Sequence, residues 1–137
     1  MKVTKNFSLK EFVSKETWDK YKSKSLWFID PRIIETAQTL RDILNTPLTI
    51  NSWSYGGNRN ESGLRIPEHK NYSPYSQHTF GRAIDIISSK YTADEMRDHI
   101  IKNSFLYPHI KAMELKVNWL HIDCRNTGDD TIYLFNP

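Results

Sequence analysis

Cysteine and long apolar runs are scarce in this sequence. Its 137 residues include one cysteine, Cys124, which excludes an internal disulfide and a metal cage built from several thiolates. A metal ion would therefore have to be bound by His, Asp and Glu. No segment approaches the roughly 20 consecutive apolar residues of a membrane-spanning helix, and residues 1–12 lack the apolar stretch of a secretory signal. We expect synthesis in the cytoplasm without a signal peptide, and no membrane insertion.

Length and composition predict one folded domain. A chain of 137 residues has the usual size of a single domain, so we predict one domain over residues 1–137, with room for one site. Hydrophobic residues make up 38% and charged residues 26%, which is enough to build a core and excludes wholesale disorder. We expect the protein to act as a monomer.

The positive charge is concentrated near the amino terminus. The formal net charge is +3, but residues 1–25 hold seven Lys against three acidic residues, a net +4, which leaves −1 for the remainder. This asymmetry could favour nucleic acid or an anionic wall polymer, although a solvated helix face explains it more simply. A nucleic-acid role would otherwise depend on Tyr55, Tyr72 and Tyr75, which are better explained as packing residues or a cleft wall. We expect no nucleic acid partner.

Signals for helix starts occur at three places. Residues 8–11 and 92–95 have the spacing of capping boxes, and Asp30-Pro31 has the residue types preferred at an N-cap and the first helical position. Apolar residues then recur at helical spacing, which predicts helices over about 31–45 and 93–101.

Short apolar or alternating segments predict a small sheet. These segments are residues 48–50, 83–87, 112–116, 119–123 and, as an edge, 132–135. Residues 51–76 are rich in Gly, Asn, Ser, Pro and Tyr and predict a long functional or mobile loop. The order of elements predicts an α+β fold, with N-terminal helices packed on a small, mainly antiparallel sheet.

His78 and Asp85 form the first candidate pair for chemistry. Asp85 stands in the middle of an otherwise apolar predicted strand, where burying a carboxylate costs free energy unless a cation or hydrogen bonds compensate it. Gly81 would let the chain turn between loop and strand, so that the imidazole and the carboxylate can converge.

A second candidate group lies on the predicted strand 119–123. Alternation places Trp119, His121 and Asp123 on one face of that strand. If Val117-Asn118 is the turn of a hairpin, Glu114 lies directly opposite His121.

These two groups together predict a metal site. His78, Asp85 and His121 could bind zinc and leave a fourth position for water, which is the arrangement of a catalytic site. A nearby carboxylate could take the proton of that water and later deliver it to a leaving amine. The remaining histidines have no partners at useful spacing, and we predict no metal role for His69, His99 and His109.

The acidic residues also have plain structural explanations. Asp85 could cap a turn or pair with Arg82, and Asp123 could simply anchor Arg125. Each explanation is reasonable alone, but together they require several coincidences.

Two motifs in order resemble a known family. Ser-Gln-His-x-x-Gly-x-Ala-x-Asp at 76–85, followed by Trp-x-His-x-Asp at 119–123, is similar to the zinc D-alanyl-D-alanine carboxypeptidases. That family also contains L-alanyl-D-glutamate endopeptidases that bacteriophages use as endolysins. The resemblance covers roughly residues 6–125, including segments 7–12 and 49–52. It implies a small α+β domain, the peptide stem of peptidoglycan as substrate, and three zinc ligands, His78, Asp85 and His121.

The chain departs from the family pattern at the expected catalytic acid. Family members commonly carry an acidic residue three positions before the second His, whereas this chain has Asn118, which cannot act as a base. The hairpin register offers Glu114 as a replacement base, with Asp123 as second choice.

A second departure concerns the arginine that binds the substrate carboxylate. The family tends to place it shortly after the strand that ends near Ser52, but here residues 53–58 intervene. Arg59 and Arg65 therefore compete for this role, because a guanidinium can bind a carboxylate through two parallel hydrogen bonds. Arg65 is the preferred candidate, and an exposed loop charge is its alternative explanation.

We therefore predict a zinc-dependent peptidase that hydrolyses an amide bond in the peptidoglycan stem peptide, as phage endolysins do. Without a signal peptide, such a lysin would act on the cell wall after release or as a virion component. The alternative, which Asn118 favours, is a catalytically inactive zinc-binding module with a structural or wall-binding role.

Overall fold

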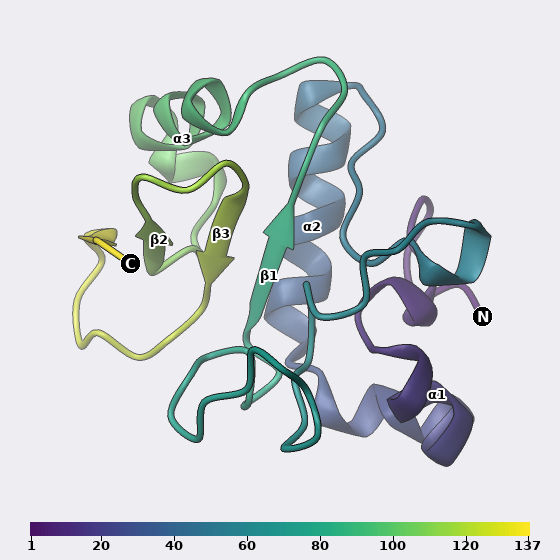
Figure 1. Cartoon of the computed structure of the whole chain (residues 1–137). Coiled ribbons are helices and arrows are strands. Elements are labelled where there is room, and N and C mark those ends of the chain that lie inside the picture. Colours follow the sequence, from purple (N-terminus) through teal and green to yellow (C-terminus); the bar gives the residue numbers. More distant parts are fainter.

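Four strands form one sheet in the order β1-β3-β2-β4 (Figure 1): β1 (Ala83–Ile86), β2 (Ala112–Glu114), β3 (Leu120–Asp123) and β4 (Tyr133–Phe135). The computed structural model describes all residues from 1 to 137. Both β1 and β2 pair antiparallel with β3, whereas the edge strand β4 pairs parallel with β2. The predicted α+β class, with a mainly antiparallel sheet, is confirmed.

The helices precede the sheet or connect its strands. The α-helices are α1 (Lys15–Tyr21), α2 (Pro31–Leu44) and α3 (Ala93–Lys102). Four short 3-10 helices are η1 (Leu9–Glu11), η2 (Lys22–Phe28), η3 (Trp53–Tyr55) and η4 (Ser104–Leu106). None of the helices is long and apolar enough to cross a membrane.

The predicted helix starts are confirmed. Ser8 and Thr92 each form a complete capping box, so side chains satisfy the exposed amides at the starts of η1 and α3. Asp30 accepts a hydrogen bond from the Arg32 amide at the start of α2, and Pro31 occupies the first turn. Helix α2 ends at Leu44, followed by Asn45 in the left-handed conformation.

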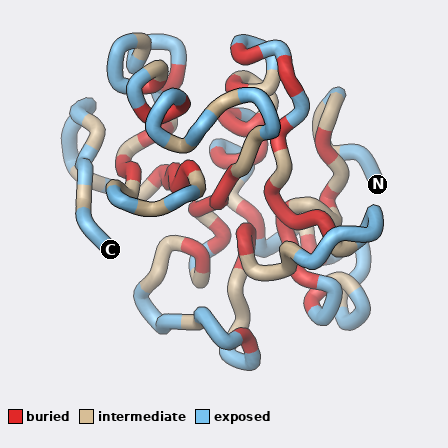
Figure 2. The backbone as a smooth tube through the Cα atoms, turned by 45° about the horizontal axis from the view of Figure 1, so that its top comes forward, coloured by how far each residue is buried: buried red, intermediate tan, exposed pale blue.

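The sheet has one apolar face and one polar face. Because side chains alternate along a strand, Ile84, Ile86, Leu120 and Ile122 point to one side, and they belong to a cluster of 23 buried apolar residues that also contains the buried face of α2. Figure 2 shows the buried residues as red segments on several parts of the chain, with exposed residues mainly in the outer loops. Helix α1 packs instead against η2. The opposite face of the sheet is left for polar side chains.

The hairpin between β2 and β3 differs from the prediction. Its strands are shorter than predicted, and the two-residue turn at Val117-Asn118 is replaced by a longer connection in which Lys116 has a φ of 61°. The buried Arg97 of α3 explains this difference. Its guanidinium donates hydrogen bonds to the carbonyls of Val117 and Trp119 at 3.1 Å each, so these groups point towards α3 rather than across the hairpin.

The predicted strand at 48–50 is reduced to a single bridge between Thr49 and Ile87. Beyond this bridge, the Asp85 amide donates to the carbonyl of Ser62 at 2.8 Å. The loop therefore occupies the edge of β1 that a longer strand would have used. Residues 51–76 form an irregular segment apart from η3, as predicted.

Candidate metal centre

The polar face of the sheet brings the two sequence motifs together. Asp85 of β1 and His121 of β3 are direct partners in the antiparallel ladder, so both side chains leave the sheet at the same point. His78 reaches them from the loop before β1, where Gly81 turns the chain with a φ of 68°. A side chain at Gly81 would meet the Phe28 carbonyl, so glycine is required there for space as well as for conformation.

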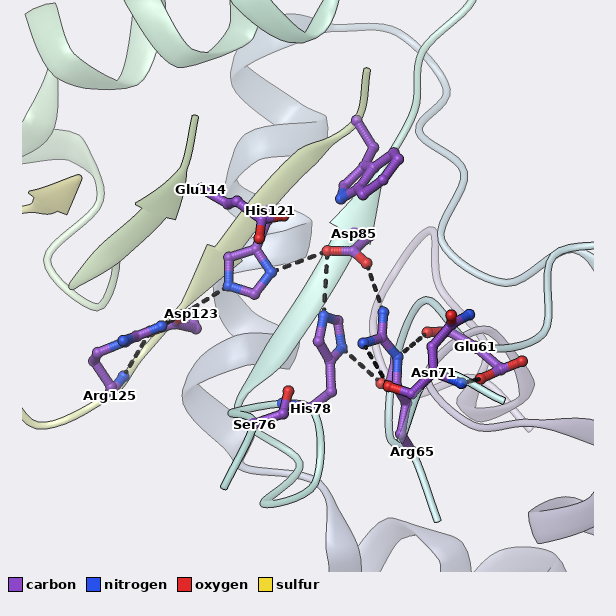
Figure 3. Close-up of polar contacts among 12 residues, drawn as sticks. Glu61, Arg65, Asn71, Ser76, His78, Asp85, Glu114, His121, Asp123 and Arg125 are labelled. Carbon is purple, nitrogen blue, oxygen red and sulfur yellow. Dashed lines mark hydrogen bonds and ion pairs between the residues drawn. The ribbon is translucent and has the colours of Figure 1, made fainter. Parts of the chain in front are cut away.

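Three side-chain atoms converge at this point. His78 Nε2 lies 3.2 Å and His121 Nδ1 lies 3.0 Å from the same oxygen of Asp85, Oδ1. Figure 3 shows both imidazoles pointing at that carboxylate. All three residues are buried, and their ligand atoms lie within 4.8 Å of one another. This group could hold a metal ion.

The orientation of His78 is fixed through the ring nitrogen that does not face Asp85. Its Nδ1 lies 2.8 Å from the carbonyl of Gly63, which can only accept a hydrogen bond, so Nδ1 carries a proton. In the neutral ring, Nε2 then presents a lone pair to Asp85. Gly63 itself is held tightly, because a Cβ there would lie 2.2 Å from the Phe12 carbonyl oxygen.

The orientation of His121 is fixed in the same way. Its Nε2 lies 2.7 Å from Oδ2 of Asp123, a carboxylate with no exposed surface. Arg125 holds that carboxylate with hydrogen bonds of 2.8 Å from Nε and 2.7 Å from Nη2. The proton of a neutral His121 ring therefore lies on Nε2, and Nδ1 presents its lone pair to Asp85. Asp123 lies behind the imidazole, which is how carboxylates orient metal-binding histidines.

The donor set fits a metal ion. Two imidazole lone pairs and one carboxylate oxygen face one another, and such acceptors repel unless a proton or a cation lies between them. Two nitrogens and one oxygen suit zinc and related transition metals.

The pKa values of Asp85 and His121 also indicate that positive charge is stabilised at this centre. Burial alone would raise the pKa of Asp85, but the two imidazoles hold it well below its usual range. Burial alone would lower the pKa of His121, but its hydrogen bonds with Asp123 and Asp85 raise it to about 9. In the metal-free protein a proton on His121 therefore supplies the charge that a metal would otherwise bring.

The centre lies in the wall of an open, polar cavity of about 680 Å³. Glu114 lines this cavity, and its carboxylate makes no hydrogen bond or ion pair within the chain. The observed pairs of Ala112 with Asp123 and Met113 with Ile122 have the predicted register, although the pairing ends before Glu114. In Figure 3, Glu114 lies beside His121. Asn118, where the family resemblance would place an acid, is exposed in the turn and does not line this cavity.

Both predicted substrate arginines reach the cavity, but much of their hydrogen-bonding capacity is used internally. Arg65 Nη2 lies 3.1 Å from Asp85 Oδ2, on the side away from the imidazoles, and its Nε donates to the Glu61 carbonyl. Arg59 donates to the carbonyls of Ile50 and Asp85. Both residues therefore brace the strand that carries Asp85.

Sequence reasoning assigned no functional role to two further cavity residues. For Arg125 the sequence predicts only an interaction with Asp123, and the Asp-x-Arg spacing is the one signal for it. Phe135 of β4 packs edge-on against His121, with ring centroids 5.6 Å apart. No local sequence pattern predicts that contact, because β4 lies near the end of the chain and reaches the sheet only through the tertiary fold. The histidines without a predicted metal role lie outside the group: His69, His99 and His109.

No family model, curated protein or solved structure matches this chain. The assignment of a candidate metal centre therefore depends on the chain's own geometry.

Proposed function

We propose that this protein is a zinc-dependent peptidase that hydrolyses an amide bond in the peptidoglycan stem peptide. The observation that carries the proposal is the convergence of His78 Nε2, His121 Nδ1 and Asp85 Oδ1 in the wall of an open cavity that also contains an unpartnered carboxylate, Glu114. A structural metal site is usually closed by four protein ligands, whereas three ligands beside a cavity leave a position for a reactant.

The identity of the metal and of the substrate is supported by the two motifs. The segments 76–85 and 119–123 resemble those of zinc D-alanyl-D-alanine carboxypeptidases and phage L-alanyl-D-glutamate endopeptidases. The proposed ligands are the residues that the geometry groups independently of that resemblance. A lysin of this type would be made in the cytoplasm and act on the wall after release or from a virion.

Each group at the site has a different role in the proposed reaction. Zinc, when bound, supplies a Lewis acid for the scissile carbonyl and lowers the pKa of coordinated water towards about 7. Glu114, free of internal partners, accepts a proton and then returns it to the leaving amine. Asp123 is fully engaged with His121 and Arg125, so it orients the imidazole rather than acting as a base. Trp119 also lines the cavity, and its indole N–H is buried without a hydrogen-bond partner in the chain.

The experiment combines zinc analysis with digestion of purified peptidoglycan. Zinc-loaded protein should release new amino termini without new reducing sugars, because the proposed attack is on an amide carbonyl and not on a glycosidic carbon. A chelator should abolish the release and zinc should restore it. New reducing ends would contradict the proposal.

Glu114→Gln provides the matched test of the base. The amide preserves shape but accepts no proton, so the variant should keep its zinc and its fold while losing about a hundredfold or more in turnover. Glu68→Gln, which changes an exposed carboxylate outside the cavity, should behave as the parent. Near-normal turnover in Glu114→Gln would place the base elsewhere. If the parent protein binds zinc and the cell wall but cleaves no bond, the alternative of a catalytically inactive module is favoured. Asn118, in place of an acidic residue, supports that alternative.

A further inference from the structure

Arg125 has a hydrogen-bonding group that the fold does not use. Its Nε and Nη2 both donate to Asp123, and its backbone amide donates to the same carboxylate at 3.2 Å. The remaining group, Nη1, donates to nothing within the chain and is not among the buried unpartnered atoms. The side chain is 26% exposed and lines the same cavity as the metal centre.

The guanidinium of Arg125 is also fixed in place. Its central carbon lies 4.7 Å from the ring centre of Phe135 and 5.9 Å from that of Tyr133, both on β4. Asp123 holds one edge of the group and these aromatic rings cover a face, so little conformational freedom remains to be lost when a ligand binds. Arg65 directs all three of its side-chain nitrogens to Asp85 and to backbone carbonyls. Arg59 directs Nε and Nη2 to backbone carbonyls, and its guanidinium is not packed against aromatic rings as that of Arg125 is.

With a divalent metal bound, the charge of the cavity would favour an anion. Three arginines and three acidic residues line it, a formal sum of zero, and a divalent metal would make this sum +2. Figure 3 shows Arg125 on the far side of His121 from Asp85. An anionic group bound by Arg125 would therefore lie beyond His121 and apart from the group held at the metal.

We propose that Arg125 binds a carboxylate of the substrate through Nη1 and makes the cavity selective for stem peptides whose glutamate carboxylate is free rather than amidated. The identity of this ligand depends on the proposed function, whereas the carboxylate-binding role of Arg125 depends only on the geometry. A charge-assisted hydrogen bond of this kind corresponds to about tenfold in affinity or more.

A purely structural role for Arg125 predicts a different outcome. If Arg125 serves only to hold Asp123, its loss weakens every ligand equally and leaves selectivity unchanged. The ratio of affinities for an acid and its amide, measured within one variant, is therefore the decisive quantity, because losses of stability or of metal cancel in the ratio.

The chain contains a matched control for this test. Arg32 holds Asp30 with the same spacing and the same atoms, with hydrogen bonds of 3.0 Å from Nε and 2.7 Å from Nη2, but it does not line the cavity. Arg32→Gln should thus preserve the selectivity that Arg125→Gln removes.

The test uses calorimetric titration of zinc-loaded protein, in the Glu114→Gln background to prevent turnover, with the free-acid and amidated forms of one stem peptide. We expect the parent and Arg32→Gln to prefer the free acid by about tenfold, and Arg125→Gln to bind both forms equally. Arg125→Lys should retain part of the preference, because it keeps the charge but loses the fork that Asp123 holds. An unchanged preference in Arg125→Gln would overturn the proposal and leave the peptidase function intact.

A second series separates this proposal from the proposed function. Linear dicarboxylates from succinate to suberate are each compared with their monomethyl esters on the same proteins. If stem peptides fail to bind but the dicarboxylate preference disappears in Arg125→Gln, the proposed function is wrong and the carboxylate site stands. If neither the stem peptides nor the dicarboxylates show a preference that depends on Arg125, the carboxylate site is refuted as well.

Discussion

Replacing Asp123 with Asn tests whether this carboxylate orients His121 or acts on the substrate. The carboxylate accepts from the His121 ring, from two nitrogens of the Arg125 side chain and from the Arg125 backbone amide. An amide has one accepting oxygen. Whichever way it turns, its NH₂ group faces a donor of either His121 or Arg125, so the variant loses hydrogen bonds and gains a donor–donor conflict.

The magnitude follows from these contacts. Loss of a carboxylate that orients a metal-binding histidine typically costs 10-fold to 100-fold in metal affinity, and we expect Asp123→Asn to fall within about this range. The free energy of unfolding should fall by about 2 kcal/mol, because charge-assisted hydrogen bonds are lost at a site with no exposed surface. Partial exposure of Arg125 keeps the loss below that of a wholly buried ion pair.

The assay is competition for zinc with a chromophoric chelator, together with denaturant unfolding of the metal-free protein. Asp30→Asn is the control, because Asp30 has the same contacts with Arg32 and caps a helix start, where Asn serves equally well. It should leave zinc affinity unchanged. If Asp123→Asn keeps full zinc affinity and loses only turnover, Asp123 is a proton acceptor and the orienting role is refuted.

Three further expectations follow from the site and its surroundings. His78→Ala should lose zinc and the thermal stability that zinc confers, whereas His69→Ala should retain both; full zinc occupancy in His78→Ala would eliminate the proposed site. In metal-free protein the pKa of His121 is about 9 against an ordinary 6.5, so its stabilising charge is fully present below pH 6.5 and is lost as the pH rises through 9. The unfolding midpoint of metal-free protein should therefore decrease as the pH is raised from 6.5 to 9. Over the same range zinc affinity should rise by up to about tenfold per pH unit, because the metal displaces one proton. If neither quantity changes with pH, this linkage is wrong. Arg97→Met should lower the free energy of unfolding by about 3 kcal/mol by leaving the carbonyls of the hairpin turn unpaired, and a loss below about 0.5 kcal/mol in denaturant unfolding would show that Arg97 does not define that turn.

Local chemistry made much of the fold predictable. The caps at Ser8, Asp30 and Thr92 act within a few residues of themselves, so spacing alone is sufficient to recognise them. The pairing register of β2 with β3 agrees with the prediction, although the two-residue turn from which it was derived is absent. The alternation of Leu120 to Asp123 excludes one-residue slips, because these would move the apolar side chains off the core face.

Contacts between distant segments were not predictable in the same way. The turn after β2 follows from Arg97, which approaches from a helix earlier in the chain, and nothing within residues 115–119 signals it. At the candidate site, the grouping of His78, Asp85 and His121 was visible as two motifs. The bracing of Asp85 by Arg65 and the contact of Phe135 with His121 depend on packing that no local pattern records.

The close approach of Gly63 to Phe12 has a consequence for how this sequence could diverge. The Gly63 carbonyl sets the tautomer of His78, a candidate metal ligand. The amide of the next residue, Leu64, donates to the Phe12 carbonyl at 2.9 Å. The backbone at Phe12 therefore helps to fix the position of the His78 side chain. An insertion next to Phe12 would shift His78 without altering any of the three side chains of the candidate metal centre. Selection for metal binding would therefore tolerate length changes in the exposed segment 126–131 while rejecting them at residues 11–13.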